Sequence, residues 1–406
     1  MTAPEPPVPA LDRLVAVDRA TFADAYWGRE ALLTRAAELP HPFTDLLDEA
    51  AVDGLVSERG LRTPFLRVAK TGQTLGDRAF TAPGGVGAGI ADQLSDSKLV
   101  ALFGDGATIV LQALHRVWPP IIDFVGALAD ELGHPVQANA YVTPPQNQGF
   151  DDHYDVHDVF VLQVAGTKRW RIHAPVWDAP LRDQPWTDRR AAVQRAAAEP
   201  PLIEAVLEPG DCLYLPRGFL HAATALGGVS THLTLGVHTW TRYALAEQLS
   251  TQALAAVAQD AAVRGSLALG TDPTRPESLA DDVEQVRAAL LEAVRTADLD
   301  TVAAALRRSD RDSRRPAPVG PLAQLEAASA LGAGSVLRLR AHLAATLDQA
   351  GGRSVLRSRA GELALDEADV APVKALLDEG HATVADLGDA LARRLVLAAV
   401  AVSAER

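Results

Sequence analysis

Two histidines and an aspartate are the residues of this chain whose types and spacing best suit chemistry. His153 and Asp155 stand two apart in the sequence HYD, and His221 follows a Pro-Arg-Gly turn in the segment LEPGDCLYLPRGFLH. Residues i and i+2 of a strand point to the same side of a sheet, so we expect one imidazole and one carboxylate to converge. A second imidazole from a neighbouring strand completes a facial triad, which leaves metal positions open and suits non-haem Fe(II) and oxygen chemistry.

The metal site has alternatives, because two polar residues two apart on a strand also occur by chance. The pair His153 and Asp155 would then form a structural hydrogen bond at the rim of a barrel. His157 has the same parity as His153 and is an alternative ligand, whereas we expect His173 and His232 to be structural. Context favours the metal site: the pair follows a Pro-containing loop, precedes an apolar strand and is answered by PRGFLH several strands later.

Lys168 is the candidate partner for a co-substrate. An iron ion with three protein ligands needs a bidentate co-substrate, and a 2-keto acid with a distal carboxylate would serve. We expect a turn at Gly166 and, on the strand after it, Lys168 pointing into the barrel. A buried lysine is costly unless an anion pairs with it. The alternative is a solvated lysine beside Arg169 and Arg171.

The last predicted strand of the barrel adds a hydroxyl group. By the period of two, Ser230, His232, Thr234 and Gly236 share one face of STHLTLGVHTW. We expect Thr234 to be the hydroxyl partner of the carboxylate that Lys168 binds.

The elements that must position these residues are short strands separated by Gly and Pro turns. The strand-like runs are VQANAYVT, DVFVLQVAG, KRWRIHA, LIEAVLEPG, DCLYLPRG and STHLTLGVHTW. This pattern predicts an antiparallel sandwich or barrel over residues 65–240. Residues 1–64 read as a helical lead-in, with one apolar face over 11–33 and a helix that begins at Thr44 and stops at Gly60.

Beyond Thr241 the pattern turns helical, and we expect a helical domain over residues 241–315. The charged and Pro-rich stretch 307–321 reads as a linker. Residues 322–406 combine short strands with a helix that ends at Gly380, which predicts a small winged-helix-like unit. Its basic residues are expected to form a solvated face: Arg338, Arg340, Arg353, Arg357 and Arg359.

Composition limits the remaining possibilities. The single cysteine, Cys212, excludes an internal disulfide and fits a reducing cytoplasm. The net charge of -14 argues against broad nucleic-acid binding and suits a basic partner. We find neither a bilayer-spanning apolar run nor a signal peptide, so we expect a cytoplasmic protein without a membrane partner.

The motifs HYD, FVLQVAGTKRWRI, LEPGDCLYLPRGFLH and STHLTL together resemble the ribosomal oxygenase branch of the JmjC/cupin-like 2-oxoglutarate dioxygenases. The resemblance implies an α+β protein: a double-stranded β-helix (jelly-roll) core, a helical dimerisation segment and a C-terminal winged helix. It also implies Fe(II) held by His153, Asp155 and His221, and 2-oxoglutarate held by Lys168 and Thr234.

The same resemblance assigns substrates and further residues. Family members hydroxylate side chains of ribosomal proteins, so a homodimer acting on a basic ribosomal-protein segment is expected. Asn139 would line the co-substrate side of the cavity and Tyr141 would face the substrate. Gly236 departs from the family, whose histidine-directed members have serine there, and arginine-directed bacterial members have arginine where Lys168 stands. The residue type attacked is therefore open.

Two other functions compete with this reading. The same site could hydroxylate a small molecule or a peptide natural product, because fold and triad do not fix the substrate. Alternatively, the chain could be a non-enzymatic regulator that uses its winged helix. The complete triad and Lys168 argue against that, and the negative charge argues against DNA binding.

Overall fold

The computed structural model describes residues 8–70 and 72–404, so the outermost residues of the predicted end domains, 1–7 and 405–406, lie outside it. The chain divides into two compact units, Met1–Thr239 and Trp240–Arg406. In the described ranges no helix has both the length and the hydropathy needed to cross a bilayer.

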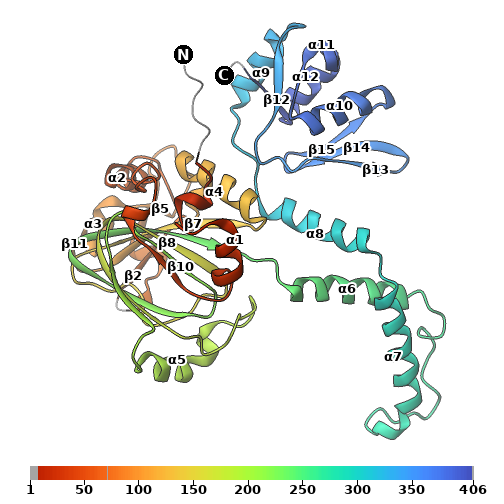
Figure 1. Cartoon of the computed structure of the whole chain (residues 1–406), viewed down its shortest axis with the longest axis horizontal. Helices are drawn as coiled ribbons and strands as arrows, with labels where there is room; N and C mark the ends of the chain where they lie inside the picture. Colours follow the sequence, from red (N-terminus) through yellow and green to blue (C-terminus); the bar gives the residue numbers. More distant parts are fainter. Residues whose placement is uncertain (1–7, 71, 405–406) are drawn as a thin grey trace. The chain divides into compact units, whose positions relative to one another are not determined.

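A large antiparallel sheet dominates the first unit, as the alternating strand pattern predicts (Figure 1). Within the described residues it has nine strands in the order β1-β10-β8-β11-β7-β6-β2-β3, with β9 paired to β8. The strands are β1 Leu32–Thr34, β2 Leu66–Lys70, β3 Gln73–Thr74, β6 Thr108–Leu111, β7 Val136–Thr143, β8 Asp158–His173, β9 Ile203–Leu207, β10 Cys212–Leu215 and β11 Leu220–Val237. Strands β4 Thr81–Ala82 and β5 Gln93–Leu94 form a separate pair.

The two faces of this sheet have different environments. On β7, Ala138, Ala140 and Val142 are buried in the main apolar core, whereas Tyr141 and Thr143 face the other side. Helix α4, Pro119–Leu132, packs against β7 and ends at Gly133, which has the left-handed φ of 71° expected of a terminating glycine. Helices α2 Glu49–Ser57 and α3 Asp96–Gly104 contribute to the same core, and α5 Arg190–Ala197 lies on the connection from β8 to β9.

The turn expected at Gly166 is wrong, because β8 is one strand that passes through this residue. Gly166 has φ of 63°, and a Cβ there would collide with the carbonyl oxygen of Val229. Glycine therefore bends the strand without ending it, and β8 stays paired with β11 on both sides of the bend. Irregular pairing of β11 between Leu226 and Thr231 accommodates the same bend.

The prediction of one helical face over residues 11–33 is also wrong for the last residues of this range. Leu32–Thr34 form strand β1, in which Leu32 lies opposite Tyr214 of β10. The preceding residues form only short helical segments, Leu11–Arg13, α1 Arg19–Thr21 and Phe22–Tyr26. An open sheet edge offered this segment backbone partners that its apolar spacing could not reveal.

The expected helix start at Thr44 is wrong as well. Helix α2 begins at Glu49, and the Asp48 carboxylate accepts a hydrogen bond of 2.7 Å from the amide of Ala51. Asp48 is the better cap because its side chain satisfies an otherwise free amide of the first turn. Phe43 and Leu47, ahead of the helix, are fully buried in the core.

The second unit contains three helices, then a mixed segment. The helices are α6 Arg242–Val257, α7 Ala280–Arg295 and α8 Leu299–Ser313. The mixed segment contains helices α9 Pro321–Ala330, α10 Glu367–Glu379, α11 Val384–Leu387 and α12 Asp389–Leu397, a sheet β16-β12-β17 (β12 Val336–Leu339, β16 His381–Thr383, β17 Ala401–Ser403) and a sheet β13-β14-β15 (β13 Thr346–Ala350, β14 Arg353–Ser358, β15 Gly361–Leu365). The linker expected from residue 307 is helical as far as Ser313.

The arginines of the mixed segment do not all form a solvated face. Arg359 has a side chain only 1% exposed and bonds to Asp310 of α8 at 2.7 Å. Arg340 donates to backbone oxygens, and Arg357 pairs with Asp348 and Glu362. Three of the five predicted solvent-facing arginines therefore hold the unit together.

Candidate active site

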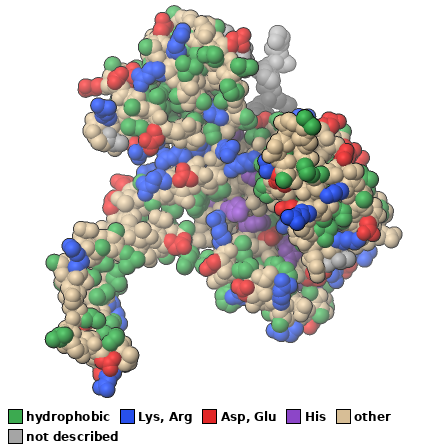
Figure 2. All heavy atoms as spheres, turned by 180° about the vertical axis from the view of Figure 1, so that it is seen from behind, with side chains coloured by type: hydrophobic (Ala, Val, Ile, Leu, Met, Phe, Trp, Pro, Cys, Tyr) green, Lys and Arg blue, Asp and Glu red, His purple; other side chains and the backbone are tan. Residues whose placement is uncertain are grey.

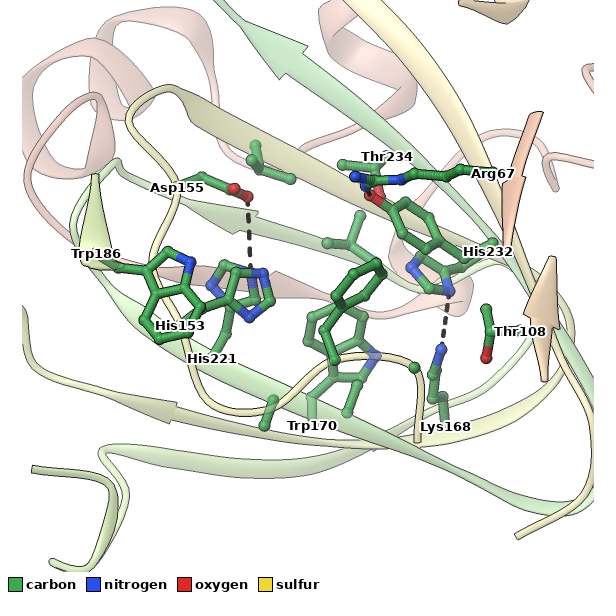
Figure 3. A pocket seen from close by; sticks show the side chains of 17 residues that line it. Arg67, Thr108, His153, Asp155, Lys168, Trp170, Trp186, His221, His232 and Thr234 are labelled. Atoms are coloured by element: carbon green, nitrogen blue, oxygen red, sulfur yellow. Dashed lines mark hydrogen bonds and ion pairs between the residues drawn. The ribbon is translucent and has the colours of Figure 1, made fainter. Parts of the chain in front are cut away.

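His153, Asp155 and His221 converge as the spacing predicts, although by a different local structure. Their ligand atoms all lie within 4.8 Å of one another, and His221 Nε2 is 3.7 Å from Asp155 Oδ2 (Figure 3). His153 and Asp155 lie in the loop before β8 and not on a strand. An isolated bridge aligns them instead: the backbones of His153 and His221 exchange hydrogen bonds of 3.2 and 2.8 Å.

The two imidazoles present the correct nitrogen to a metal. His153 Nδ1 lies 2.7 Å from the carbonyl oxygen of Asp151, and His221 Nδ1 lies 3.1 Å from that of Phe219. A carbonyl oxygen only accepts, so each Nδ1 carries the hydrogen and each Nε2 keeps a free lone pair. Backbone contacts of this kind fix the tautomer and ring orientation of metal-binding histidines.

The electrostatics of the triad agree with metal binding. Burial lowers the pKa of His221 to about 4, so the imidazole is neutral at neutral pH, as a ligand must be. Burial acts to raise the pKa of Asp155, but the surrounding imidazoles and Arg67 outweigh it and hold this pKa below its usual value. Two imidazoles and one carboxylate fit Fe(II), and they leave coordination positions for a co-substrate and oxygen.

The triad opens into a cavity of about 250 Å³ inside the first unit. This volume is below the roughly 300–1,000 Å³ of pockets that enclose whole drug-sized ligands, so it suits a small co-substrate and one side chain. Its lining consists of Arg67, Thr108, Tyr141, Gly149, Phe150, His153, Asp155, Val159, Val161, Lys168, Trp170, Trp186, His221, Ala222, Ala223, His232 and Thr234.

Lys168 points into this cavity and not into solvent. Its side chain is buried, and its Nζ donates to Thr143 Oγ1 at 3.1 Å and lies 3.4 Å from His232 Nδ1. Burial lowers its pKa to about 7. Because it forms no ion pair with any described carboxylate, an anion bound beside it would remove most of the cost of burying its charge.

His232 and Trp170 belong to the same end of the cavity, although we expected His232 to be only structural. The His232 ring stacks on Tyr141 at 4.9 Å and packs edge-on against Trp170 at 5.4 Å. Burial, followed by Lys168, lowers the pKa of His232 well below its ordinary value. Trp170 Nε1 is buried and bonds to no described residue, so it is a free donor in the cavity wall. The period of two already placed His232 on the face of Thr234.

The remaining predicted residues separate into two groups. Tyr141 and Thr234 line the cavity. Asn139 shares the face of Tyr141, but its side-chain oxygen accepts from the Ala113 amide at 3.0 Å and it is not part of the cavity lining. Gly236 lies outside the lining too.

Two neighbouring side chains crowd the position of Gly236. A Cβ there would approach His157 Cε1 to 2.9 Å and Gln137 Nε2 to 3.0 Å. The His157 imidazole, which is not among the three converging ligands, therefore fills the space that a larger residue would need. His173 is buried away from the cavity, in agreement with a structural role.

Phe150, Trp186 and Arg67 are among the cavity residues that were not singled out from the sequence. Phe150 and Trp186 place their rings 6.0 and 6.3 Å from the His153 ring and form apolar walls beside the metal site. Arg67 comes from β2, and its Nη2 lies 3.4 Å from the Tyr141 hydroxyl. These residues meet through pairing of distant segments, for which the local pattern gives no signal.

Comparison with known proteins supports the family resemblance. The model of the JmjC domain family matches residues 123–245, which include all three predicted ligands and Lys168. Human ribosomal oxygenase 1 is 33% identical over 225 residues, which make up 54% of this chain and 33% of that protein. The bifunctional lysine-specific demethylase and histidyl-hydroxylase NO66 of Drosophila mojavensis is 32% identical over 225 residues, 55% of this chain and 24% of that protein.

A solved structure resembles the whole chain. The Escherichia coli ribosomal oxygenase YcfD, in complex with cobalt and 2-oxoglutarate, is 17% identical, with a TM-score of 0.53 over 97% of this chain and 99% of that one. At this identity the match shows a shared fold. The chain spans only about a quarter to a third of the length of the two curated relatives. Residues 123–245 thus match the JmjC domain, and over 225 residues the chain is similar to proteins named as ribosomal oxygenases or as NO66.

Proposed function

We propose that this protein is an Fe(II)- and 2-oxoglutarate-dependent oxygenase that hydroxylates a side chain of a protein, specifically a ribosomal protein. The observation that carries the proposal is the pairing, in one cavity, of a His-Asp-His triad with free ligand nitrogens and a buried lysine that has no acidic partner among the described residues. Such a cavity needs both a metal and an anion to compensate its charges.

The residues of this chain divide the work. Iron with 2-oxoglutarate would supply the activation of oxygen and the oxidising power for attack on an unactivated C–H bond. Lys168 would hold the distal carboxylate, and the Trp170 N–H would donate to the same co-substrate between the triad and Lys168 (Figure 3). Thr234 would add a hydroxyl group. Phe150 and Trp186 would exclude water beside the metal.

The ribosomal substrate is supported by the names of the relatives and by charge. Proteins with a matching domain are called ribosomal oxygenases. The net charge of -14 favours association with a basic segment such as those of ribosomal proteins. A cavity of about 250 Å³ accommodates one side chain of that segment and leaves the rest of it at the surface.

We also propose that α6–α8 pair two copies of the chain. Helix α7 has an apolar stripe at helical spacing, formed by Leu279, Val283, Val286 and Leu290. Val283 and Val286 are 46% and 37% exposed, and Figure 2 shows hydrophobic side chains along this segment at the lower left. A second copy would cover this stripe across a two-fold axis. We assign residues 322–406 to a winged-helix-like domain, without a nucleic-acid partner.

The test has two parts. Purified protein should convert 2-oxoglutarate to succinate only when Fe(II) is present. Mass spectrometry of ribosomal proteins from cells with and without the gene should reveal one peptide that is lighter by one oxygen in the deletion strain. Turnover in the tube without any ribosomal difference would favour a small-molecule or peptide substrate, and no turnover would reject the oxygenase.

A further inference from the structure

Arg67 is a second cation in the cavity, and strand pairing explains how it arrives there. Arg67 lies opposite Val110 of β6, Val110 opposite Tyr141 of β7, and Tyr141 opposite His232 of β11. Residues directly opposite one another on adjacent strands share a face of the sheet. Arg67 therefore belongs to the row that carries Tyr141 and His232 into the cavity.

The guanidinium of Arg67 has few direct partners, although its charge acts on Asp155. Its Nε is buried without a hydrogen-bond partner among the described residues, and no ion pair within 4.0 Å joins it to a described carboxylate. Its contacts are one long hydrogen bond, 3.4 Å, to the Tyr141 hydroxyl, and the Phe150 ring, whose centroid is 5.1 Å from Cζ. A guanidinium has five donors, so most of its bonding capacity is free.

Arg67 does not duplicate Lys168. Figure 3 shows the two side chains on opposite sides of His232, with the Arg67 guanidinium next to Thr234 and the Lys168 ammonium towards Thr108. Tyr141 contacts Arg67 through its hydroxyl and stacks on His232, which in turn contacts Lys168. Phe150 contacts Arg67 and also lies next to His153, so Arg67 is on the side of the cavity where the aromatic walls flank the metal site.

The charges of the lining restrict what can enter. Asp155 is the only acid among the described residues that line the cavity, and its carboxylate would be a metal ligand. With Lys168 paired to the carboxylate of the co-substrate, a lysine or arginine side chain would still meet the Arg67 guanidinium without a free carboxylate to pair with, and like charges in a poorly solvated site repel. A carboxylate or amide oxygen would instead receive hydrogen bonds from Arg67.

We propose that Arg67 is a specificity-determining residue that binds the oxygen of an acidic or amide substrate side chain, so that the residue hydroxylated is Asp, Asn, Glu or Gln and not a cation. Tyr141 assists because its hydroxyl, which accepts from Arg67, retains its own hydrogen to donate. Gly236 contributes no donor, since His157 occupies the space that its side chain would need. The flanking residues of the substrate can still be basic. The inference rests on the proposed function.

Capped amino acids test the inference without knowledge of the natural substrate. The full chain, loaded with Mn(II) and the unreactive analogue N-oxalylglycine, is titrated with the N-acetyl amides of Asp, Asn, Arg, His and Leu. Broadening of their NMR lines by Mn(II) reports binding near the triad, and tryptophan fluorescence of the metal-free protein gives a second readout. We expect the Asp and Asn compounds to bind about tenfold more tightly than the Arg compound.

Variants assign this preference to Arg67. Arg67→Gln should reduce the preference for Asp over Arg by about tenfold, and Arg67→Lys should restore it for Asp more than for Asn, because it keeps the charge but loses the planar fork. Arg78→Gln, at an exposed position of the same unit, is the control. Circular dichroism and thermal unfolding verify that each variant is folded.

The results that overturn the inference differ from those that overturn the proposed function. The role of Arg67 would be rejected if the Arg or His compound bound more tightly than the Asp compound, or if the protein showed no preference or bound none of the compounds. It would also be rejected if Arg67→Gln left the preference unchanged. An increased 2-oxoglutarate requirement in Arg67→Gln like that expected of Lys168 variants would reject it as well, since Arg67 would then bind co-substrate. Failure of the wild type to consume 2-oxoglutarate would reject the oxygenase itself.

Discussion

The cavity of the first unit and helix α7 of the second unit lack opposite kinds of partner. In the cavity, polar groups are buried without compensation: Lys168 has no acid, and both Arg67 Nε and Trp170 Nε1 lack an acceptor among the described residues. Along α7, apolar groups are exposed without cover, with Val283 46% and Leu291 66% accessible.

The type of unsatisfied group in each region indicates the type of partner that would stabilise it. Buried hydrogen-bond donors are satisfied by an anion or an oxygen acceptor, whose binding is directional and sensitive to pH. Exposed apolar side chains are buried by another apolar surface, whose binding depends on the apolar area buried and on the protein concentration. Substitutions in the cavity should therefore change chemistry and leave assembly intact, and substitutions on α7 should do the reverse.

The largest effect is expected at the triad. His153→Ala or Asp155→Ala removes one of three metal ligands, so Fe(II)-dependent 2-oxoglutarate turnover should fall by more than about a hundredfold. Succinate formation measures turnover, and titration with Co(II), followed by its visible absorption, measures the metal site independently. The control is His173→Ala, at a buried histidine outside the cavity. Turnover unaffected by either ligand substitution would remove the triad from the chemistry.

The next largest effect is expected at Lys168. Lys168→Met keeps much of the side-chain volume but removes the charge, so the apparent KM for 2-oxoglutarate should rise about a hundredfold, with a smaller change in kcat. Arg169→Met, at the exposed neighbouring position, should leave KM unchanged. An unaltered KM in Lys168→Met would place the distal carboxylate elsewhere.

The low pKa of Lys168 also predicts a pH dependence. Burial lowers this pKa to about 7, and a bound carboxylate favours the protonated form, so binding takes up a proton above pH 7. The affinity for 2-oxoglutarate should therefore be constant below pH 7 and weaken by about tenfold for each pH unit above it. Calorimetry in buffers of different ionisation enthalpy measures the proton uptake. If Lys168→Met loses this pH dependence, the dependence is assigned to Lys168. A wild-type affinity for 2-oxoglutarate that does not change with pH would contradict the prediction.

The smallest effect on chemistry is expected from α7. Val286→Glu places a charge in the apolar stripe and should shift the protein from a dimer to the 42.9 kDa monomer in sedimentation velocity. Ala288→Glu, on the opposite side of the helix, is the matched control. Turnover of 2-oxoglutarate should change less than about twofold in either variant, because the cavity lies within the first unit. A wild-type protein that is monomeric at all concentrations would remove the dimer.

Patterns of a few residues were sufficient to predict much of the site. The H-x-D pair and the histidine after Pro-Arg-Gly are local signals, and a buried lysine between apolar neighbours on one strand face is another. The antiparallel sheet followed from the short strand-like runs, and the end of α10 at Gly380 followed from glycine. The prediction was wrong where non-local pairing determined the structure, as at β1 and at the bend of β8 through Gly166.

The sequence alone determined which side chains could bind a metal and an anion, because these chemical roles belong to residue types and short spacings. Only the tertiary structure decided which other groups meet them. Arg67, Tyr141 and His232 are far apart in the chain and share one row of the sheet through the pairing of four strands. Register fixes that row, and register depends on the packing of whole strands against the core, which no short segment encodes.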